Sequence, residues 1–184
     1  MTDTLVRPIQ IQAQKLAASQ APIKAKYRES PASAQLVLHA RGQVMQDALA
    51  CEVPGHNGIT RAGLHPATGG DGTLACSGDM LLQALVGCAG VTLAAVATAI
   101  GVTIDTTQIT AEGDLDFRGT LGVDKTTEVG FSTIRLLFSI RTDANDGQLE
   151  TLKKLTERYC VVYQTLAKGI KIDSAFVRLS AAPQ

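Results

Sequence analysis

The feature that most constrains this chain is residues 68–101, where a glycine-rich loop leads into a long apolar run. From Met80 to Ile100 the run carries no charged residue, and the glycine that follows at 101 is a natural helix end. Ser77 is a suitable N-cap, and Asp79 falls in the first turn, where the helix dipole favours a negative charge. We therefore predict a long helix that is apolar on every side and, for that reason, buried all round.

A membrane span is the main alternative for this run, because about 20 apolar residues are enough to cross a bilayer. The run is rich in Ala, Gly and Thr, which are only weakly hydrophobic. Its nearest basic residues are Arg61 and Arg118, so neither end has the Lys or Arg anchor that orients a span. We therefore expect a central core helix and no membrane partner.

Composition narrows the function classes further. The 184 residues fit one domain with a sizeable core, and 17 basic residues balance 17 acidic ones without clusters of either sign. Aromatic residues make up only 4% of the chain and Trp is absent, which argues against base stacking and nucleic acid. The N-terminus lacks the apolar core of a secretory signal, and the four cysteines form no CxxC, so we expect a reduced, cytoplasmic protein.

The rest of the chain alternates between strand-like and helix-like segments. We expect helix at 8–28, as one helix or two split near Pro22, and a hairpin turning at Arg41–Gly42, followed by loop from Pro54 to Gly72. Further expected elements are a strand at 104–117, a strand at 128–141, a helix at 148–168 capped by Asn145 or Asp146, and a strand at 170–179. This order predicts an α+β domain with a mostly antiparallel sheet.

Two groups of side chains could in principle bind a metal. Cys51, His56, His65 and Cys76 are zinc-ligand types, but their spacings match no common zinc motif. The carboxylates at 112, 114 and 116 share one strand face, for which a solvated surface is the commoner explanation. We therefore expect no metal and no cofactor.

Each of the two predicted long helices carries one cysteine near its middle. Cys88 has glycine neighbours at 87 and 90, which would let other groups approach its sulfur closely, and Cys160 lies in ERYCVVYQTL on the inward face of the second helix. Free cysteines are usually inert packing residues. Two packed antiparallel helices could instead bring this pair close enough for redox chemistry.

The chain resembles the OsmC/Ohr family, the osmotically inducible and organic hydroperoxide resistance proteins. The likeness rests on SGDMLLQALVGCAGVTL around Cys88, ERYCVVYQTL around Cys160 and the order of the elements, and covers about residues 33–179. It implies an N-terminal helical extension at 1–32 and an OsmC-like domain at 33–184, with two long central helices, that forms an intertwined homodimer.

In that family the first cysteine, here Cys88, attacks an organic hydroperoxide and becomes a sulfenic acid. The second, here Cys160, resolves it to a disulfide that a dithiol such as dihydrolipoamide reduces. A family arginine stabilises the thiolate, and Arg41 and Arg61 are the candidates for it, with Asp79 the carboxylate nearest to the place of the family glutamate. The alternative is a protein of the same fold that holds an apolar small molecule at its dimer interface without turnover.

Overall fold

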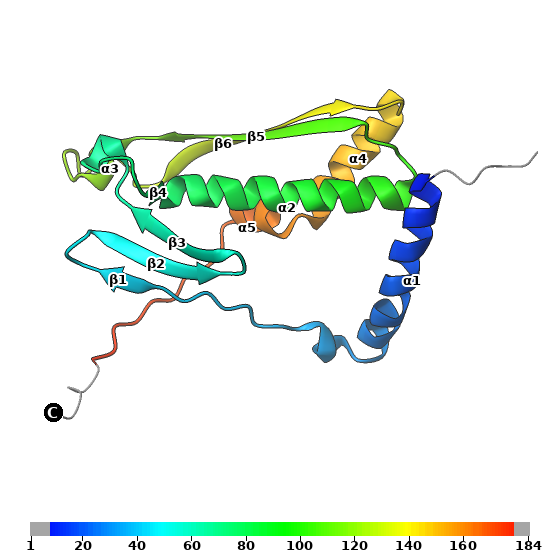
Figure 1. Cartoon of the computed structure of the whole chain (residues 1–184), viewed down its shortest axis with the longest axis horizontal. Coiled ribbons are helices and arrows are strands. Elements are labelled where there is room, and N and C mark those ends of the chain that lie inside the picture. Colours follow the sequence, from blue (N-terminus) through cyan, green and yellow to red (C-terminus); the bar gives the residue numbers. More distant parts are fainter. Residues whose placement is uncertain (1–7, 179–184) are drawn as a thin grey trace, which may run out of the picture.

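The long apolar run lies at the centre of the computed structural model, which describes residues 8–178 (Figure 1). It forms helix α2, Ser77–Ile100, as the sequence predicts. The N-cap is Cys76 rather than Ser77, which becomes the first helical residue. At the other end Gly101 adopts the left-handed conformation, with φ of 73°, and its N–H donates to the carbonyls of Ala97 and Thr98. A residue without a Cβ adopts this conformation at no steric cost, which explains why the helix ends there.

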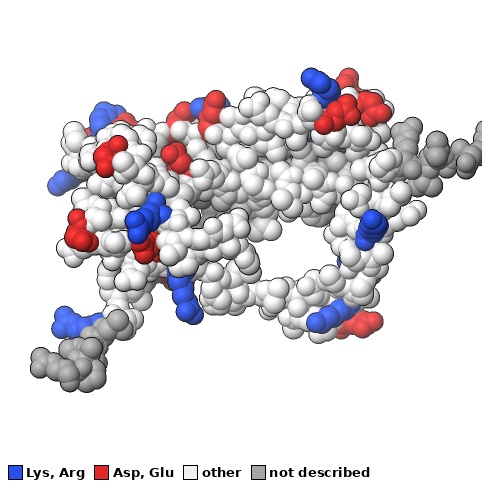
Figure 2. All heavy atoms as spheres, in the orientation of Figure 1, with Lys and Arg blue, Asp and Glu red and all other residues white. Residues whose placement is uncertain are grey.

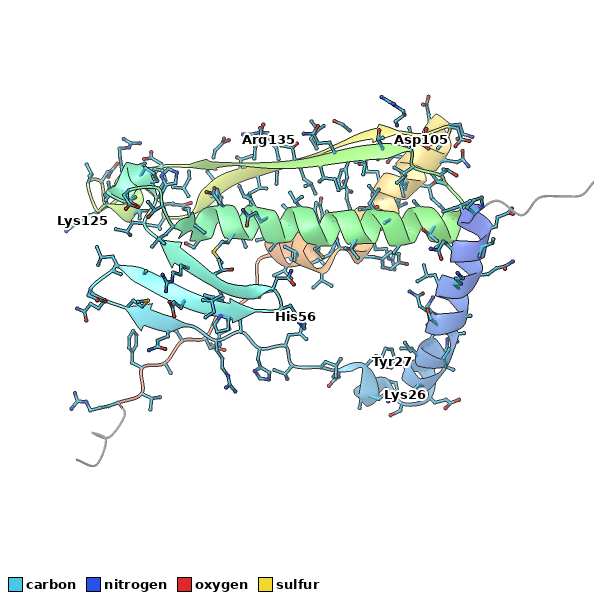
Figure 3. All side chains as sticks on the ribbon, in the orientation of Figure 1. Lys26, Tyr27, His56, Asp105, Lys125 and Arg135 are labelled. Atoms are coloured by element: carbon cyan, nitrogen blue, oxygen red, sulfur yellow. The ribbon has the colours of Figure 1, made fainter. Side chains whose placement is uncertain are left out.

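A two-stranded ribbon lies along one side of α2. Strands β5, Thr106–Leu115, and β6, Phe131–Arg141, pair in antiparallel register from Thr106↔Arg141 to Leu115↔Phe131. Their side chains alternate between half-buried and exposed, as a ribbon with one covered face requires. Arg135 lies on the outer face (Figure 3), where it pairs with Glu112 and Asp114. Glu112 and Asp114, two of the three carboxylates considered above, therefore form ion pairs on a solvated face of the ribbon, as expected.

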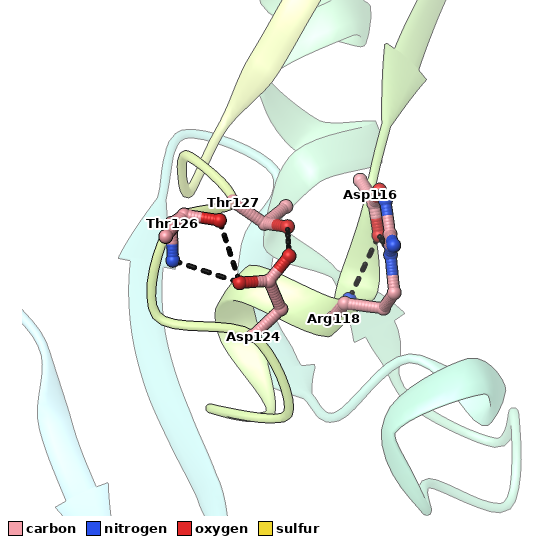
Figure 4. A network of polar contacts seen from close by, with 5 residues as sticks. All are labelled: Asp116, Arg118, Asp124, Thr126 and Thr127. Atoms are coloured by element: carbon pink, nitrogen blue, oxygen red, sulfur yellow. Dashed lines mark hydrogen bonds and ion pairs between the residues drawn. The ribbon is translucent and has the colours of Figure 1, made fainter.

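The connection between β5 and β6 is held by carboxylates that bind their own neighbours (Figure 4). Asp116 caps the short helix α3, Phe117–Thr120, and forms an ion pair of 2.6 Å with Arg118. The hydrogen bonds from Arg118 lower the pKa of Asp116 to about 2. Asp124 accepts hydrogen bonds from the backbone and hydroxyl of Thr126 and from the hydroxyl of Thr127. These local bonds define the path of the chain between the strands.

A second, four-stranded sheet lies near the start of α2. It consists of β1, Gln43–Met45, β2, Ala50–Gly55, β3, Gly58–Gly63, and β4, Ala75–Cys76. The strands follow in the order β1-β2-β3-β4, with only the β3–β4 pair parallel. With the ribbon, this sheet confirms the α+β class and its mostly antiparallel pairing.

The turns of this sheet correct the sequence prediction. No hairpin forms at Arg41–Gly42, and residues 35–42 are extended without strand pairing. The chain turns instead at 46–49 and between Gly55 and Gly58, so β3 occupies part of the expected loop, and the rest contains a 3-10 turn, Pro66–Thr68. Gly58 has φ of 117°, a conformation that glycine accommodates best, and this favours the tight turn here.

The second long helix is divided. It forms α4, Asp146–Tyr159, and α5, Val161–Lys168, with the extended residue Cys160 between them. The expected cap at Asn145 is confirmed, since its side chain and that of Gln148 form a reciprocal capping box. The expectation of one helix from 148 to 168 is wrong, because Cys160 has ψ of 110° and ends one helix while it caps the next.

Both ends of the described chain extend beyond this body. Helix α1, Pro8–Glu29, is continuous through Pro22, is followed by a 3-10 turn at Pro31–Ala34, and stands across the end of α2 (Figure 1). Figure 2 shows an opening between α1 and the rest of the chain. Residues 170–178 form no strand, contrary to expectation, because they pair with no described strand and lie exposed; Leu179, the expected end, lies outside the described residues.

The core is built on one face of α2. Its buried residues are Leu93, Val96, Ala97, Val102 and Leu152. On the opposite face Val91 is 74% exposed, so the prediction that α2 is buried all round is wrong for the single chain. Within residues 8–178, α2 alone is long and apolar enough to cross a membrane, a test that the core helices of soluble proteins also pass.

Leu152 offers a direct test of this core. It is 1% exposed and joins α4 to α2, so Leu152→Ala should lower the free energy of unfolding by about 2–5 kcal/mol through lost burial and the cavity that remains. Leu121→Ala, at a 53% exposed turn residue, should cost less than about 1 kcal/mol. Urea denaturation of the two variants measures both values; equal losses would contradict this position of the core.

Candidate active site

Cys88 lies at the boundary between the covered and open faces of α2. At 100° per residue it falls between the buried Leu85 and Ala89 on one side and the exposed Gly87 and Val91 on the other. The space beside Gly87 is empty, because a Cβ built there would meet nothing within 4 Å among the described residues. The Cys88 side chain is itself half-buried. One side of Cys88 is therefore packed against the core, and its other side is open to an approaching molecule.

Cys160 lies opposite, at the junction of α4 and α5. It is fully buried, with 0% exposure, and its Sγ accepts a hydrogen bond of 3.4 Å from the backbone N–H of Tyr163. A sulfur in this place acts as an N-cap, because it binds one of the N–H groups that a helix start leaves without partners. The extended backbone of Cys160 is thus what aims the start of α5.

The start of α5 points at Cys88. Burial is the largest single influence on the Cys88 thiol and raises its pKa. Hydrogen bonds from the N–H groups of Val162 and Val161 and from the thiol of Cys160 outweigh burial, so the pKa lies below its usual value. The groups that lower the pKa of Cys88 are thus backbone N–H groups and an uncharged side chain.

The pKa of Cys160 moves in the opposite direction. Burial raises it most, the N–H of Tyr163 lowers it, and the hydrogen bond to Cys88 and the negative charge of Cys88 raise it further. Of the two thiols, Cys88 is therefore the one that ionises at the lower pH, and Cys160 keeps its proton and donates to it.

The charged candidates from the sequence lie elsewhere in the single chain. Arg61 on β3 is 61% exposed and forms an ion pair of 2.8 Å with Glu52 on β2. Arg41 lies in the exposed segment before β1. Asp79 is exposed in the first turn of α2, nine residues before Cys88, which corresponds to about 14 Å along a helix axis. The chain does not bring Asp79 to the sulfur.

The remaining cysteines and histidines are also dispersed. Cys51 is on β2 and Cys76 follows β3 on β4, while His56 lies at the tip of the β2–β3 hairpin (Figure 3). His65 stacks on Phe117, with ring centroids 5.0 Å apart. Among the residues that the structure describes, no group of three or more His, Cys, Asp or Glu side chains is placed to hold a metal ion.

Sequence reasoning missed the groups that influence Cys88 most. The sequence predicted a cation as the group that stabilises the thiolate. The donors are instead backbone N–H groups at the start of α5. The sequence does not reveal this helix start, since no Pro, Gly or usual cap residue stands at position 160. Thr92 had a weak signal: it lies one turn after Cys88, where a hydroxyl reaches back, and it donates to the Cys88 carbonyl at 2.8 Å.

Comparison with known proteins identifies the fold. The family described as OsmC-like protein matches residues 70–175. An OsmC-like protein from Mycoplasma pneumoniae has a TM-score of 0.60 at 15% identity, and the match covers 74% of this chain and 90% of that one. No match was found among curated proteins.

Two further solved structures are similar. A Psychrobacter arcticus protein, described as a putative osmotic stress induced and detoxification response protein, has a TM-score of 0.56 at 13% identity over 71% of this chain and 89% of its own. A Legionella pneumophila protein, described as an organic hydroperoxide resistance protein, has a TM-score of 0.52 at 14% identity over 72% and 91%. At these identities the likeness concerns the fold alone.

The role of the α5 N–H groups can be tested at Val161. Pro at this first helical position suits the backbone but removes the N–H, so Val161→Pro should raise the pKa of Cys88 and slow its alkylation near neutral pH. In the unaltered protein, the midpoint of the pH–rate profile with iodoacetamide should lie below that of an ordinary cysteine thiol.

Val161→Ala is the matched control, because it shortens a side chain that is 70% exposed and keeps the N–H. It should leave the midpoint unchanged. A midpoint that is the same in the Pro and Ala variants would exclude the N–H of residue 161 as a donor that lowers this pKa.

Proposed function

This chain belongs to the OsmC-like protein family, and from that membership and from the thiols of Cys88 and Cys160 we propose that it is a thiol-dependent peroxidase for organic hydroperoxides. The observation that carries the proposal is the Cys88 sulfur, which receives hydrogen bonds from Cys160 and from the start of α5. Such an environment lowers the pKa of a sulfur, and a thiolate rather than a thiol attacks peroxides.

In the first step the Cys88 thiolate attacks the terminal oxygen of the hydroperoxide. The O–O bond breaks, an S–O bond forms, and the alkoxide leaves as an alcohol after it takes up a proton. Cys88 is oxidised to a sulfenic acid while the peroxide is reduced. Apolar residues on the open face beside Cys88, such as Val91, suit an organic peroxide better than the strongly hydrated hydrogen peroxide.

In the second step Cys160 resolves the sulfenic acid. The negative charge of Cys88 is one cause of the raised pKa of Cys160, and this cause disappears once Cys88 has become a neutral sulfenic acid. Cys160 then ionises more easily, attacks the Cys88 sulfur and releases water as the disulfide forms. The two pKa shifts thus set the order of the steps, since each thiol becomes reactive when it is needed.

An external dithiol such as dihydrolipoamide would complete the cycle: it reduces the disulfide and becomes a cyclic disulfide itself. A chemistry of this kind needs a compartment in which thiols are kept reduced, so we place the protein in the cytoplasm. All four cysteines, which lie within the described residues, are free in the structure.

Cysteine variants test the assignment. With cumene hydroperoxide and dihydrolipoamide, Cys88→Ser should lose all turnover, and Cys160→Ser should consume one equivalent and stop as a sulfenic acid that dimedone traps. Cys76→Ser is the matched control, since Cys76 precedes Cys88 by about 18 Å along the helix axis. Turnover in Cys88→Ser, or a Cys76–Cys88 crosslink after oxidation, would refute the assignment of Cys88 and Cys160 as the redox pair.

We also propose that the working form is a homodimer. The open face of α2 carries Ala84, Gly87, Val91 and Ala94 at spacings of three and four, and all four are exposed in the single chain. An uncharged helix stripe of this kind needs an apolar cover in water, and a second copy supplies one by symmetry. Because Cys88 lies beside this stripe, the partner would border the site and could bring Arg41 or Arg61 to it.

Val91→Arg should dissociate the dimer, because it places a charge on the stripe. Val123→Arg is the control: this residue is 73% exposed, nearly the same as the 74% of Val91, but lies in the turn between β5 and β6. Sedimentation at micromolar concentration should give a dimer for the unaltered protein and for Val123→Arg, and a monomer or misfolded chain for Val91→Arg. A folded, unaltered monomer would contradict the dimer.

A further inference from the structure

Helix α1 packs on the rest of the chain through its first half only. Its half-buried residues lie three and four positions apart on one face and are Ile9, Ala13, Leu16 and Gln20. From residue 21 to residue 29 every side chain is exposed, and no residue of α1 is buried. Figure 3 places Lys26 and Tyr27 at the end of α1 that lies farthest from α2. The second half of the helix therefore projects from the body of the chain, residues 43–178.

The half-buried face of α1 continues into the projecting half. Ile23 and Tyr27 follow Gln20 at the same spacings of three and four, so they extend the stripe that is covered in the first half. Pro22 lies inside the helix, where a proline removes a hydrogen bond and destabilises the helical conformation. Short helical segments in water depend on packing for most of their stability. The projecting half therefore needs a surface that covers Ile23 and Tyr27.

This stripe borders an opening in the molecule. The opening seen in Figure 2 lies between α1 and α2, and the segment at 31–42, which leads back to β1, encloses it on a third side (Figure 1). Exposed apolar side chains occur on all three segments: Ile23 on α1, residues 36–38 on the returning segment, and Val91 on α2. Exposed apolar surface of this extent is typical of a protein–protein contact.

The distribution of charge favours a second copy of the chain as the partner. Residues 8–42, which we call the arm, carry five basic side chains and one acidic one, whereas the body carries eleven basic and fifteen acidic ones. Three of the basic side chains, Lys24, Lys26 and Arg28, lie in the projecting half of α1. Because this positive half stands away from its own body, the negative body of another copy is a complementary surface for it.

We propose that the arm closes around a second copy of the chain and that Ile23 and Tyr27 pack on that copy. In a two-fold dimer this contact occurs twice, because each copy gives one arm and receives one. The inference rests on the dimer proposed above and adds a second contact to it: the stripe at Val91 joins the two bodies, and the arms hold them together. Helix α1 lies outside the residues that match the family, 70–175, so this contact belongs to the extension.

Photo-crosslinking shows which chain the arm contacts. Benzoylphenylalanine in place of Tyr27 should give, on irradiation, a covalent product with the mass of two chains. The matched control carries benzoylphenylalanine in place of Ala25, which is exposed on the opposite side of the same helix, and it should give little of this product.

The other outcomes of irradiation separate the arm from the dimer. If the protein sediments as a dimer but position 27 crosslinks only within its own chain, or not at all, the arm proposal is wrong and the dimer remains. A folded monomer would overturn both proposals.

Glutamate substitutions measure how strongly the arm holds the partner. Ile23→Glu places a charge on the stripe, and Ala25→Glu places the same charge on the opposite side of the helix. Native mass spectrometry of each protein mixed with its isotope-labelled form follows the exchange of subunits. Exchange should be at least about tenfold faster in Ile23→Glu than in the unaltered protein, because a buried apolar contact is lost, and unchanged in Ala25→Glu. Equal exchange rates in the two variants would contradict the arm contact.

Discussion

The structure depends on one constraint: a helix of 24 residues that has no charged side chain after Asp79 must be kept from water. Helices α1, α4 and α5 and the strands β4 and β5 all contact it. The β5–β6 ribbon covers one side, α4 and α5 cover another, and α1 lies across its end (Figure 1). The part that remains open includes a stripe of small residues and Val91, and the Cys88 sulfur lies at the border of that stripe.

The chemistry of the site is set mainly by backbone geometry. An arginine would stabilise a thiolate with a permanent charge. Here two N–H groups at the start of α5 act on Cys88, and they can do so because Cys160 is extended and interrupts the helix. The same residue thus shapes the site and supplies its second sulfur, which ties the electrostatics of one thiol to the position of the other.

The elements with strong local signals were predictable from the sequence. The apolar run and Gly101 defined α2, the reciprocal cap at Asn145 defined the start of α4, and alternation defined the ribbon. The break at Cys160 was not predictable, because no Pro, Gly or usual cap residue marks this position. For the same reason the N–H donors to Cys88 were not predicted. The turns of the β1–β4 sheet were misplaced because several glycines in that region compete as turn sites. The two cysteines themselves could be selected from sequence only by resemblance.

The order in which contacts form during folding has a consequence for the thiols. The ribbon can close early, since its turn is fixed by Asp124 and its strands are near in sequence. Contacts between α2 and α5 join distant parts of the chain and carry a larger loop-closure cost, so they form later. Until α5 docks, Cys88 lacks its N–H donors and behaves as an ordinary thiol. A newly made chain therefore carries an ordinary thiol at position 88 through its most exposed stage, and the pKa of Cys88 falls only when α5 has docked.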